Sequence, residues 1–266
     1  MAGASAIRFG VSRNHGGLQL LDGARALAEA LGGALGETVR LTIAFDYVHL
    51  LRNFSSGAID VAWMPPLLHA QAAREGGTLA AVCQRHGKLT YRSALIVRSS
   101  SSYRTITDLA GARVAWVDRG SASGYVFPRL HLAKRGVELV RETFEGSPVA
   151  ACAAVAKGEA DVCACFAPDT SDAEAQLADF RATVGQSASA LRILDVTEPI
   201  PPDGIALGGH VAAREQTRLR VALLALHQTS VGAHALKTLL QAERLVAPTD
   251  EVLRALKTLG ASSPPV

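Results

Sequence analysis

Residues 112–137 read ARVAWVDRGSASGYVFPRLHLAKRGV, and they predict a strand, a Gly/Ser-rich turn and a helix in direct succession. The apolar run Val114–Val117 is typical of a buried strand, and the apolar residues from Tyr125 onward recur at helical spacing. Ser121 and Ser123 therefore lie at a helix start, where the first backbone N–H groups lack acceptors and the helix dipole favours negative charge. Such a turn can bind a phosphate-like or carboxylate oxygen. The alternative is that one of these serines only caps the helix.

The alternation of strands and helices occurs twice along the chain. It restarts at Leu109, after a run of four serines that is typical of a surface segment or hinge. The tail after Gly209 is helical. Two α/β lobes of similar size predict a ligand cleft between them. We expect the first lobe to contain residues 1–97 and 203–266, and the second to contain residues 98–202.

Three further candidate side chains lie where predicted strands end. Tyr47 follows Asp46 at a strand-to-helix corner. Trp63 ends a strand that stops at two prolines, and His15 lies in SRNHGG, after the first strand. Corners of this kind line the ligand crevice in α/β sheets. Trp63 is equally typical of a core residue, so both interpretations stay open.

Composition excludes several classes of protein. The chain has 266 residues, of which 48% are hydrophobic and 19% charged, as in globular proteins. A net charge of +3 with dispersed Lys and Arg gives no basic stripe, so we expect no nucleic-acid partner. No apolar run reaches the roughly 18 residues of a membrane span, so we expect no membrane insertion.

Cysteines and the N-terminal sequence bear on location and metals. Cys163 and Cys165 would share one face of a strand, which is more typical of buried packing than of a zinc site. The eight histidines are scattered without ligand spacing, and we expect no metal and no cofactor. The first residues do not resemble a signal peptide. Free thiols favour the cytoplasm, with a periplasmic or lipid-anchored protein as the alternative if a signal peptide was removed.

Six motifs spread over nearly the whole chain carry a family resemblance. They are DY (46–47), GAIDVAW (57–63), YRS (91–93), DLAGARVAWVDRGSASGY (108–125), GEADV (158–162) and IPPD (200–203). Together they resemble the PhnD-type phosphonate-binding proteins of ABC transporters, and the stretch DRGSASGY is the most specific. The resemblance implies a two-lobed type II periplasmic-binding-protein fold, a hinge of two crossing strands, and an oxyanionic head group held at the helix start.

The resemblance also implies roles for individual residues. The head-group tripeptide of the family matches Ser121, Ala122 and Ser123. Its cleft aromatics match Tyr47, Tyr91 and, as a further candidate, Trp63. The acid that members with amino-phosphonate ligands use matches Asp203. Each has an ordinary alternative: the tyrosines could be strand-end aromatics, and Asp203 could be a turn former in PPDG.

Two positions depart from the family pattern. The middle residue of the tripeptide is Ala122 where the family usually has Thr, and Pro148 stands where the family has His. Both changes remove a donor from the predicted oxyanion site. A retuned phosphonate site and a different ligand therefore both stay open.

We expect a binding protein rather than an enzyme. Its ligand would be a small-molecule anion, and it would act as the monomeric solute-binding protein of an ABC permease or as a cytoplasmic sensor. The alternative is a cytoplasmic lyase or synthase on the same fold. The GSASG turn is not a nucleophile elbow, because its central residue is Ala122. Asp46, Asp118 or His15 could serve as a base only with a substrate bound.

Overall fold

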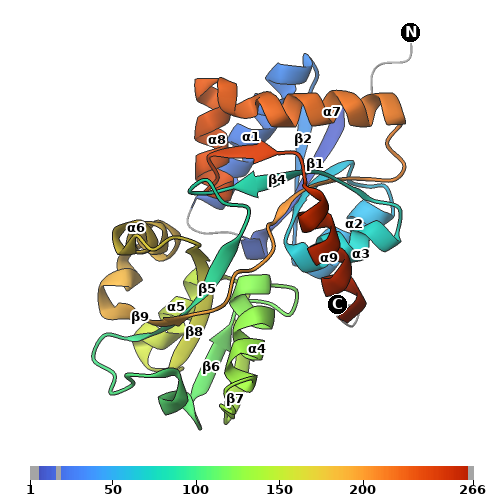
Figure 1. Ribbon diagram of the computed structural model, residues 1–266. Helices are drawn as coiled ribbons and strands as arrows, with labels where there is room; N and C mark the ends of the chain where they lie inside the picture. The colour runs from blue at the N-terminus through green and yellow to red at the C-terminus, as the bar shows by residue number, and fades with distance from the viewer. Residues whose placement is uncertain (1–5, 16–18, 263–266) are drawn as a thin grey trace. The chain divides into compact units, whose positions relative to one another are not determined.

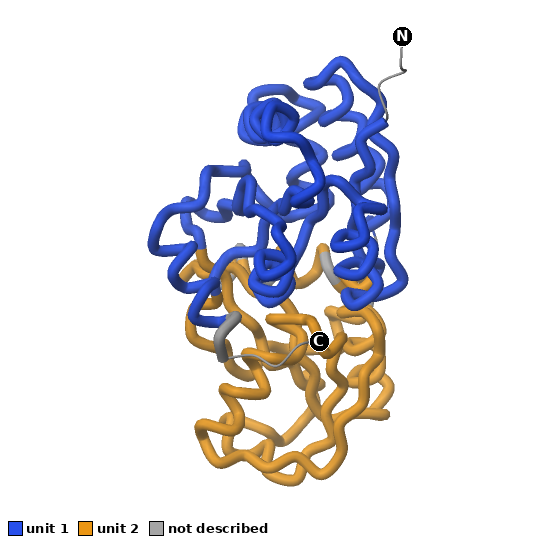
Figure 2. The backbone as a smooth tube through the Cα atoms, turned by 90° about the vertical axis from the view of Figure 1, so that its right-hand side faces the viewer, with its two compact units in different colours: residues 1–13, 19–89, 201–266 blue, residues 14–18, 90–200 orange. Residues whose placement is uncertain are grey.

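A computed structural model describes residues 6–15 and 19–262 of the chain (Figure 1). The chain forms two compact units (Figure 2). The first contains residues 1–13, 19–89 and 201–266, and the second contains residues 14–18 and 90–200. Strand β5, Tyr91–Arg98, belongs to the second unit, whereas the expected boundary at residue 97 ends the first lobe inside this strand.

The first unit is built on a six-stranded sheet with the order β11-β4-β10-β3-β1-β2. Its strands are β1 (Ile7–Ser12), β2 (Val39–Ala44), β3 (Val61–Met64), β4 (Thr78–Gln84), β10 (Gly204–Leu207) and β11 (Arg244–Val246). β1 runs parallel to β2 and β3, whereas β10 is inserted antiparallel between β3 and β4. This insertion places the residue before β10, Asp203, beside the ends of two strands from the N-terminal part of the chain.

The described residues of this unit also form six α-helices (Figure 1). They are α1 (Leu20–Leu35), α2 (Tyr47–Ser55), α3 (Pro66–Arg74), α7 (Ala213–Ala225), α8 (Ser230–Leu240) and α9 (Asp250–Ser262). α1 packs against α7 and α8, and α3 packs against α9. α1 buries Ala24, Leu27 and Leu31 on one face and ends at Gly36, whose φ of 69° is the left-handed conformation that suits glycine.

The second unit has a five-stranded sheet with the order β7-β6-β8-β5-β9. Its other elements are β6 (Arg113–Trp116), β7 (Arg141–Phe144), β8 (Val162–Pro168), β9 (Leu191–Val196), α4 (Phe127–Ala133), α5 (Pro148–Lys157) and α6 (Ala173–Val184). Alternate residues of β5 enter two hydrophobic clusters, Ile96 on one face and Val97 on the other. Both faces of this sheet are therefore covered.

The stretch from residue 112 to 137 folds as its sequence predicts. β6 ends at Trp116, a turn follows, and a π-helical turn, Ala122–Val126, leads directly into α4. Pro128 is the second residue of α4 and follows the π-helical turn closely. The α/β class with two sheets is thereby confirmed.

All four cysteines are buried free thiols. Cys163 and Cys165 lie in the same hydrophobic cluster as Cys152, which confirms their packing role. Within residues 6–15 and 19–262, no three His, Cys, Asp or Glu side chains are arranged to hold a metal ion. None of the helices in the described ranges combines the length and apolar character needed to cross a bilayer.

Candidate functional site

The serine loop, residues 117–126, follows β6 and closes on itself through backbone hydrogen bonds. The N–H of Val117 donates to the carbonyl of Gly124 over 3.0 Å, and the N–H of Ser121 donates to the carbonyl of Asp118 over 3.0 Å. The N–H of Val126 returns to the carbonyl of Ser121. The loop is therefore a defined turn on the carboxyl end of β6.

Ser121 and Ser123 have different positions in this loop. The Oγ of Ser121 accepts the N–H of Gly124 at 3.0 Å, so Ser121 is the N-cap of the helical segment. Its role in ligand binding stays a prediction. Ser123 does not cap the helix. Its carbonyl oxygen accepts the hydroxyl of Ser93 at 2.5 Å, which ties the loop to β5.

Four donors in the serine loop have no acceptor among the residues that the structure describes. They are the backbone N–H groups of Ala122 and Ser123 and the hydroxyl hydrogens of Ser121 and Ser123. Ser121 and Ala122 are buried, and Ser123 is half-buried. Because a buried donor without an acceptor is costly, an oxyanion seated here would be bound by groups that the fold leaves unsatisfied.

The side chain of Asp118 and the absence of one at Gly124 fix the shape of the serine loop. The carboxylate of Asp118 accepts the N–H of Gly120 at 2.7 Å through Oδ1 and the side-chain amide of Asn14 at 2.6 Å through Oδ2. At Gly124, a Cβ atom would lie 2.5 Å from Cγ2 of Val117, so only glycine fits here without a rearrangement.

In the first unit, the Asp203 cluster consists of Trp63, His69, Arg85 and Asp203. The guanidinium of Arg85 donates to Oδ1 and Oδ2 of Asp203 at 2.6 and 2.8 Å, and the indole N–H of Trp63 donates to Oδ2 at 2.7 Å. Arg85 also donates to the carbonyl of Leu240. Asp203 is 3% exposed and Arg85 is 5% exposed, so this is a buried, bidentate ion pair.

His69 lies at the first turn of α3 and is 5% exposed. Burial lowers the pKa of its imidazole to about 4, against the opposing effect of the Asp203 charge. Its Nε2 atom has no hydrogen-bond partner among the described residues. The imidazole is therefore neutral at pH 7.

The structure places the predicted aromatic residues in buried positions. Tyr47 is the first residue of α2, behind the N-cap Asp46, and its ring lies 6.4 Å from that of Trp63, centroid to centroid. Tyr91 begins β5 and stacks on Phe166 with ring centroids 5.5 Å apart. Tyr47 and Trp63 belong to the hydrophobic core of the first unit. Their ligand contacts stay predictions.

The predicted site residues fall into two groups. Tyr47, Trp63 and Asp203 come together in the first unit. The other predicted residues, Ser121, Ala122, Ser123, Tyr91 and His15, all belong to the second unit. His15 is half-buried at the end of the short 3-10 turn Arg13–His15.

Three residues that hold predicted site residues or their loop in place were not among those predicted. Ser93 holds the carbonyl of Ser123, Asn14 holds Asp118, and Arg85 neutralises Asp203. Ser93 carried a signal, because it ends the YRS motif. Asn14 was considered only as a neighbour of His15. The sequence around Arg85 contains no signal that could predict Asp203 as its partner.

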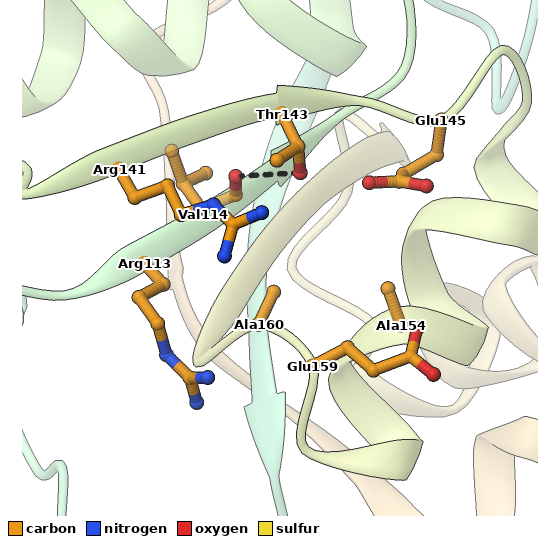
Figure 3. A pocket seen from close by; sticks show the side chains of 8 residues that line it. All are labelled: Arg113, Val114, Arg141, Thr143, Glu145, Ala154, Glu159 and Ala160. Carbon is orange, nitrogen blue, oxygen red and sulfur yellow. Dashed lines mark hydrogen bonds between the residues drawn. The ribbon is translucent and has the colours of Figure 1, made fainter.

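A separate pocket of about 430 Å³ opens along the edge of the second sheet (Figure 3). It is lined by Arg113, Val114, Arg141, Thr143, Glu145, Ala154, Glu159 and Ala160. Two guanidinium groups lie on one side of Figure 3 and two carboxylates on the other. Arg113 is already paired with Asp161 at 2.8 Å. None of the predicted site residues lines this pocket.

Comparison with known proteins gives a family match over most of the chain. The family described as "ABC transporter, phosphonate, periplasmic substrate-binding protein" matches residues 9–253. A curated relative, the phosphate-import protein PhnD of Mycolicibacterium smegmatis, is 27% identical over 159 residues, covering 54% of this chain and 49% of the relative. The matched part thus spans about half the length of that relative.

Solved structures show the same fold. PhnD1 from Prochlorococcus marinus in complex with methylphosphonate has a TM-score of 0.82 and 18% identity, covering 96% of this chain and 97% of that one. A binding protein component of an ABC phosphonate transporter from Pseudomonas aeruginosa has a TM-score of 0.81 and 21% identity, covering 96% and 85%. The chain therefore has the two-lobed type II periplasmic-binding-protein fold.

Two alternatives from the sequence lose support. Neither the family nor these relatives support the enzyme alternative. The cytoplasmic location is not supported either, because the family is described as periplasmic. That expectation relied on free thiols, and the structure buries all four of them, so they pack as small apolar side chains whatever the compartment.

Proposed function

Because the chain belongs to the phosphonate-binding family of periplasmic substrate-binding proteins of ABC transporters, we propose that it binds a phosphate-like oxyanion without transforming it. The candidate ligands are phosphate, phosphite and short alkylphosphonates. A relative named for phosphate import and a neighbour solved with methylphosphonate support this class of ligand. An ABC permease is the proposed partner, and a periplasmic location the proposed compartment, to be checked by fractionating cells that express the natural gene.

The observation that supports the proposal most strongly is that four donors of the serine loop have no acceptor among the described residues. Two are consecutive backbone N–H groups at a helical start, and two are the hydroxyls of Ser121 and Ser123. Hydrogen bonds to a charged acceptor contribute about 1.5 to 3 kcal/mol each. An oxyanion gains this at every donor without displacing an internal hydrogen bond.

We propose that the remaining predicted residues contact the ligand away from its oxyanion. Tyr47, Trp63 and Tyr91 would contact its apolar part, and His15 would contribute from the segment after β1. Ala122 would contribute its backbone N–H alone. Asp203 would act through Trp63, whose indole N–H it accepts.

Calorimetry with phosphate, phosphite and methylphosphonate tests the proposal. Ser123→Ala removes a donor that has no role in the empty protein, so binding should weaken by about tenfold or more while the melting temperature stays unchanged. Ser121→Ala should weaken binding and also cost about 1 kcal/mol of stability, because it removes the helix cap.

The matched control is Thr229→Ala, which removes the N-cap of α8 in the first unit. It should cost similar stability without changing affinity. Wild-type protein that binds none of the three anions would overturn the proposal, as would a Ser123→Ala variant with full affinity.

A further inference from the structure

Two cysteines of the second unit lie in contact although they come from different elements. The Sγ atom of Cys152, in α5, is 3.5 Å from the Sγ atom of Cys163, in β8. We propose that these two residues form a disulfide in an oxidising compartment, which joins α5 covalently to β8 and stabilises the second unit. The inference goes beyond anion binding and needs no ligand.

The fold places the two sulfur atoms close enough for a bond. A disulfide has an S–S distance of about 2.0 Å, so the two atoms must approach each other by about 1.5 Å. Rotation about the side-chain torsion angle of each cysteine moves its sulfur without moving the backbone. α5 and β8 pack against each other (Figure 1), and both thiols are fully buried in one hydrophobic cluster. The packing of a helix on a strand therefore holds the pair at contact distance.

The other two cysteines are less suited as partners. Cys165 lies on the same face of β8 as Cys163, and its thiol donates to the carbonyl of Phe166 at 3.5 Å. Side chains two residues apart on a strand are parallel and about 6.7 Å apart, whereas a disulfide needs Cβ atoms about 3.8 Å apart, so Cys163 and Cys165 cannot bond to each other. Cys165 also interacts with Cys152, so this pairing is the alternative that the experiment must separate. Cys83 belongs to the core cluster of the first unit.

The bond forms by two thiol–disulfide exchanges with a disulfide-bearing oxidant. The thiolate of one cysteine attacks the oxidant, forms a mixed disulfide and releases a first reduced thiol. The thiolate of the other cysteine attacks the protein sulfur of the mixed disulfide and releases a second. The two protein thiols lose two electrons to the oxidant, and their two protons pass to the released thiols. Because both cysteines are buried in the folded chain, the exchange takes place before α5 has packed on β8. The periplasm proposed above is a compartment in which disulfides form and persist.

Refolding in a glutathione redox buffer tests the proposal. Reduced wild-type protein is unfolded in denaturant and refolded with reduced and oxidised glutathione, the remaining thiols are alkylated, and a tryptic digest is analysed by mass spectrometry. Trypsin places Cys152 in the peptide 142–157 and both Cys163 and Cys165 in the peptide 158–181. We expect most chains to give these two peptides joined, with Cys165 alkylated. Four alkylated cysteines, or joined peptides in which Cys163 is the alkylated residue, would overturn the proposal.

Oxidation in denaturant is the control for the role of the fold. The joined peptides should then fall to a minor fraction, because the unfolded chain does not hold the two sulfur atoms in contact. Equal yields with and without denaturant would overturn the proposal. Cys83→Ala is the matched variant, since it removes a buried thiol from the first unit and should leave the yield unchanged.

Thermal melting measures the stabilisation. The two cysteines are 11 residues apart in the sequence, and a bond between them restricts the unfolded chain, so the oxidised protein should melt about 5 °C or more above the reduced protein. Cys152→Ala should lose this difference, and Cys83→Ala should keep it. Equal melting temperatures of the oxidised and reduced wild type would overturn the stabilising role of the bond. If Cys152→Ala does not fold, the peptide analysis of the wild type alone supports or overturns the proposal.

Discussion

The serine loop and the Asp203 cluster use their polar groups in opposite ways. In the serine loop, two N–H groups and two hydroxyls have no acceptor within the described chain. In the Asp203 cluster, the carboxylate accepts N–H groups from the side chains of Arg85 and Trp63. The first arrangement is complete only when a ligand supplies oxygens, and the second is complete without one. Changes in the loop should therefore act mainly on binding, and changes in the cluster mainly on stability.

Arg85→Met should have the largest effect on folding. It leaves the Asp203 carboxylate buried without its cation, and breaking a buried pair on one side costs about 3 to 5 kcal/mol of unfolding free energy. Denaturant unfolding measures this loss. The double variant Arg85→Met, Asp203→Asn removes both charges and keeps an acceptor for Trp63, so it should recover most of the stability. A loss below about 1 kcal/mol in the single variant would contradict the internal ion pair.

The next effect is a dependence of stability on pH that comes from His69. In the unfolded chain its pKa is near 6.5, and in the folded chain it is lowered to about 4, so between these values the unfolded state binds more protons. Stability from this group is therefore complete above pH 6.5 and decreases as the pH falls to 4. The difference of about 2.5 pKa units corresponds to roughly 3 kcal/mol.

Unfolding by denaturant at pH 7, 6, 5 and 4.5 measures this dependence. His69→Gln cannot titrate and should lose the decline over this range. An equally steep decline in the variant would assign the effect to other groups. Burial raises the pKa of Asp60, but hydrogen bonds from Arg8 and His210 lower it further, and Arg113 lowers the pKa of Asp161. These two groups should therefore reduce stability only at lower pH, as their carboxylates become protonated.

Gly124→Ala should have a smaller effect on stability and a clear effect on binding. The added methyl group would lie 2.5 Å from a carbon of Val117 and 2.7 Å from Oγ of Ser121, so the loop must move, at a cost of about 1 to 3 kcal/mol. Because the loop positions the four free donors, affinity for the anion should fall as well. Thermal melting and calorimetry measure the two effects.

Gly33→Ala is the control for that substitution. Gly33 lies inside α1, and a Cβ there would meet nothing within 4 Å, so alanine should raise stability by about 0.5 to 1 kcal/mol through its better helix propensity. Anion affinity should not change. If Gly124→Ala were as well tolerated as Gly33→Ala, the shape of the serine loop would not matter for the site.

The sequence by itself determined the local structure of the anion site. The apolar run of β6, the glycines and serines after it, and a proline allowed only in a first helical turn are all neighbours in the chain, so their effect on the backbone is local. Ser121 was therefore placed correctly at a helix start. The choice between cap and ligand donor was not available from the sequence, because one hydroxyl can do both, and only the structure shows that it accepts from Gly124.

Only the tertiary structure decided the partners of the charged and polar side chains. Asp203 is 118 residues from Arg85 and 140 from Trp63, and Asn14 is 104 residues from Asp118. Asp203 meets its partners because β10 is inserted between β3 and β4, with Gly204 opposite Met64 on one side and Val82 on the other. Strand order depends on how the whole sheet packs, which no short window of sequence contains. The sequence could therefore propose Asp203 as a ligand residue, but the balance of its charge by Arg85 follows from the order of the strands.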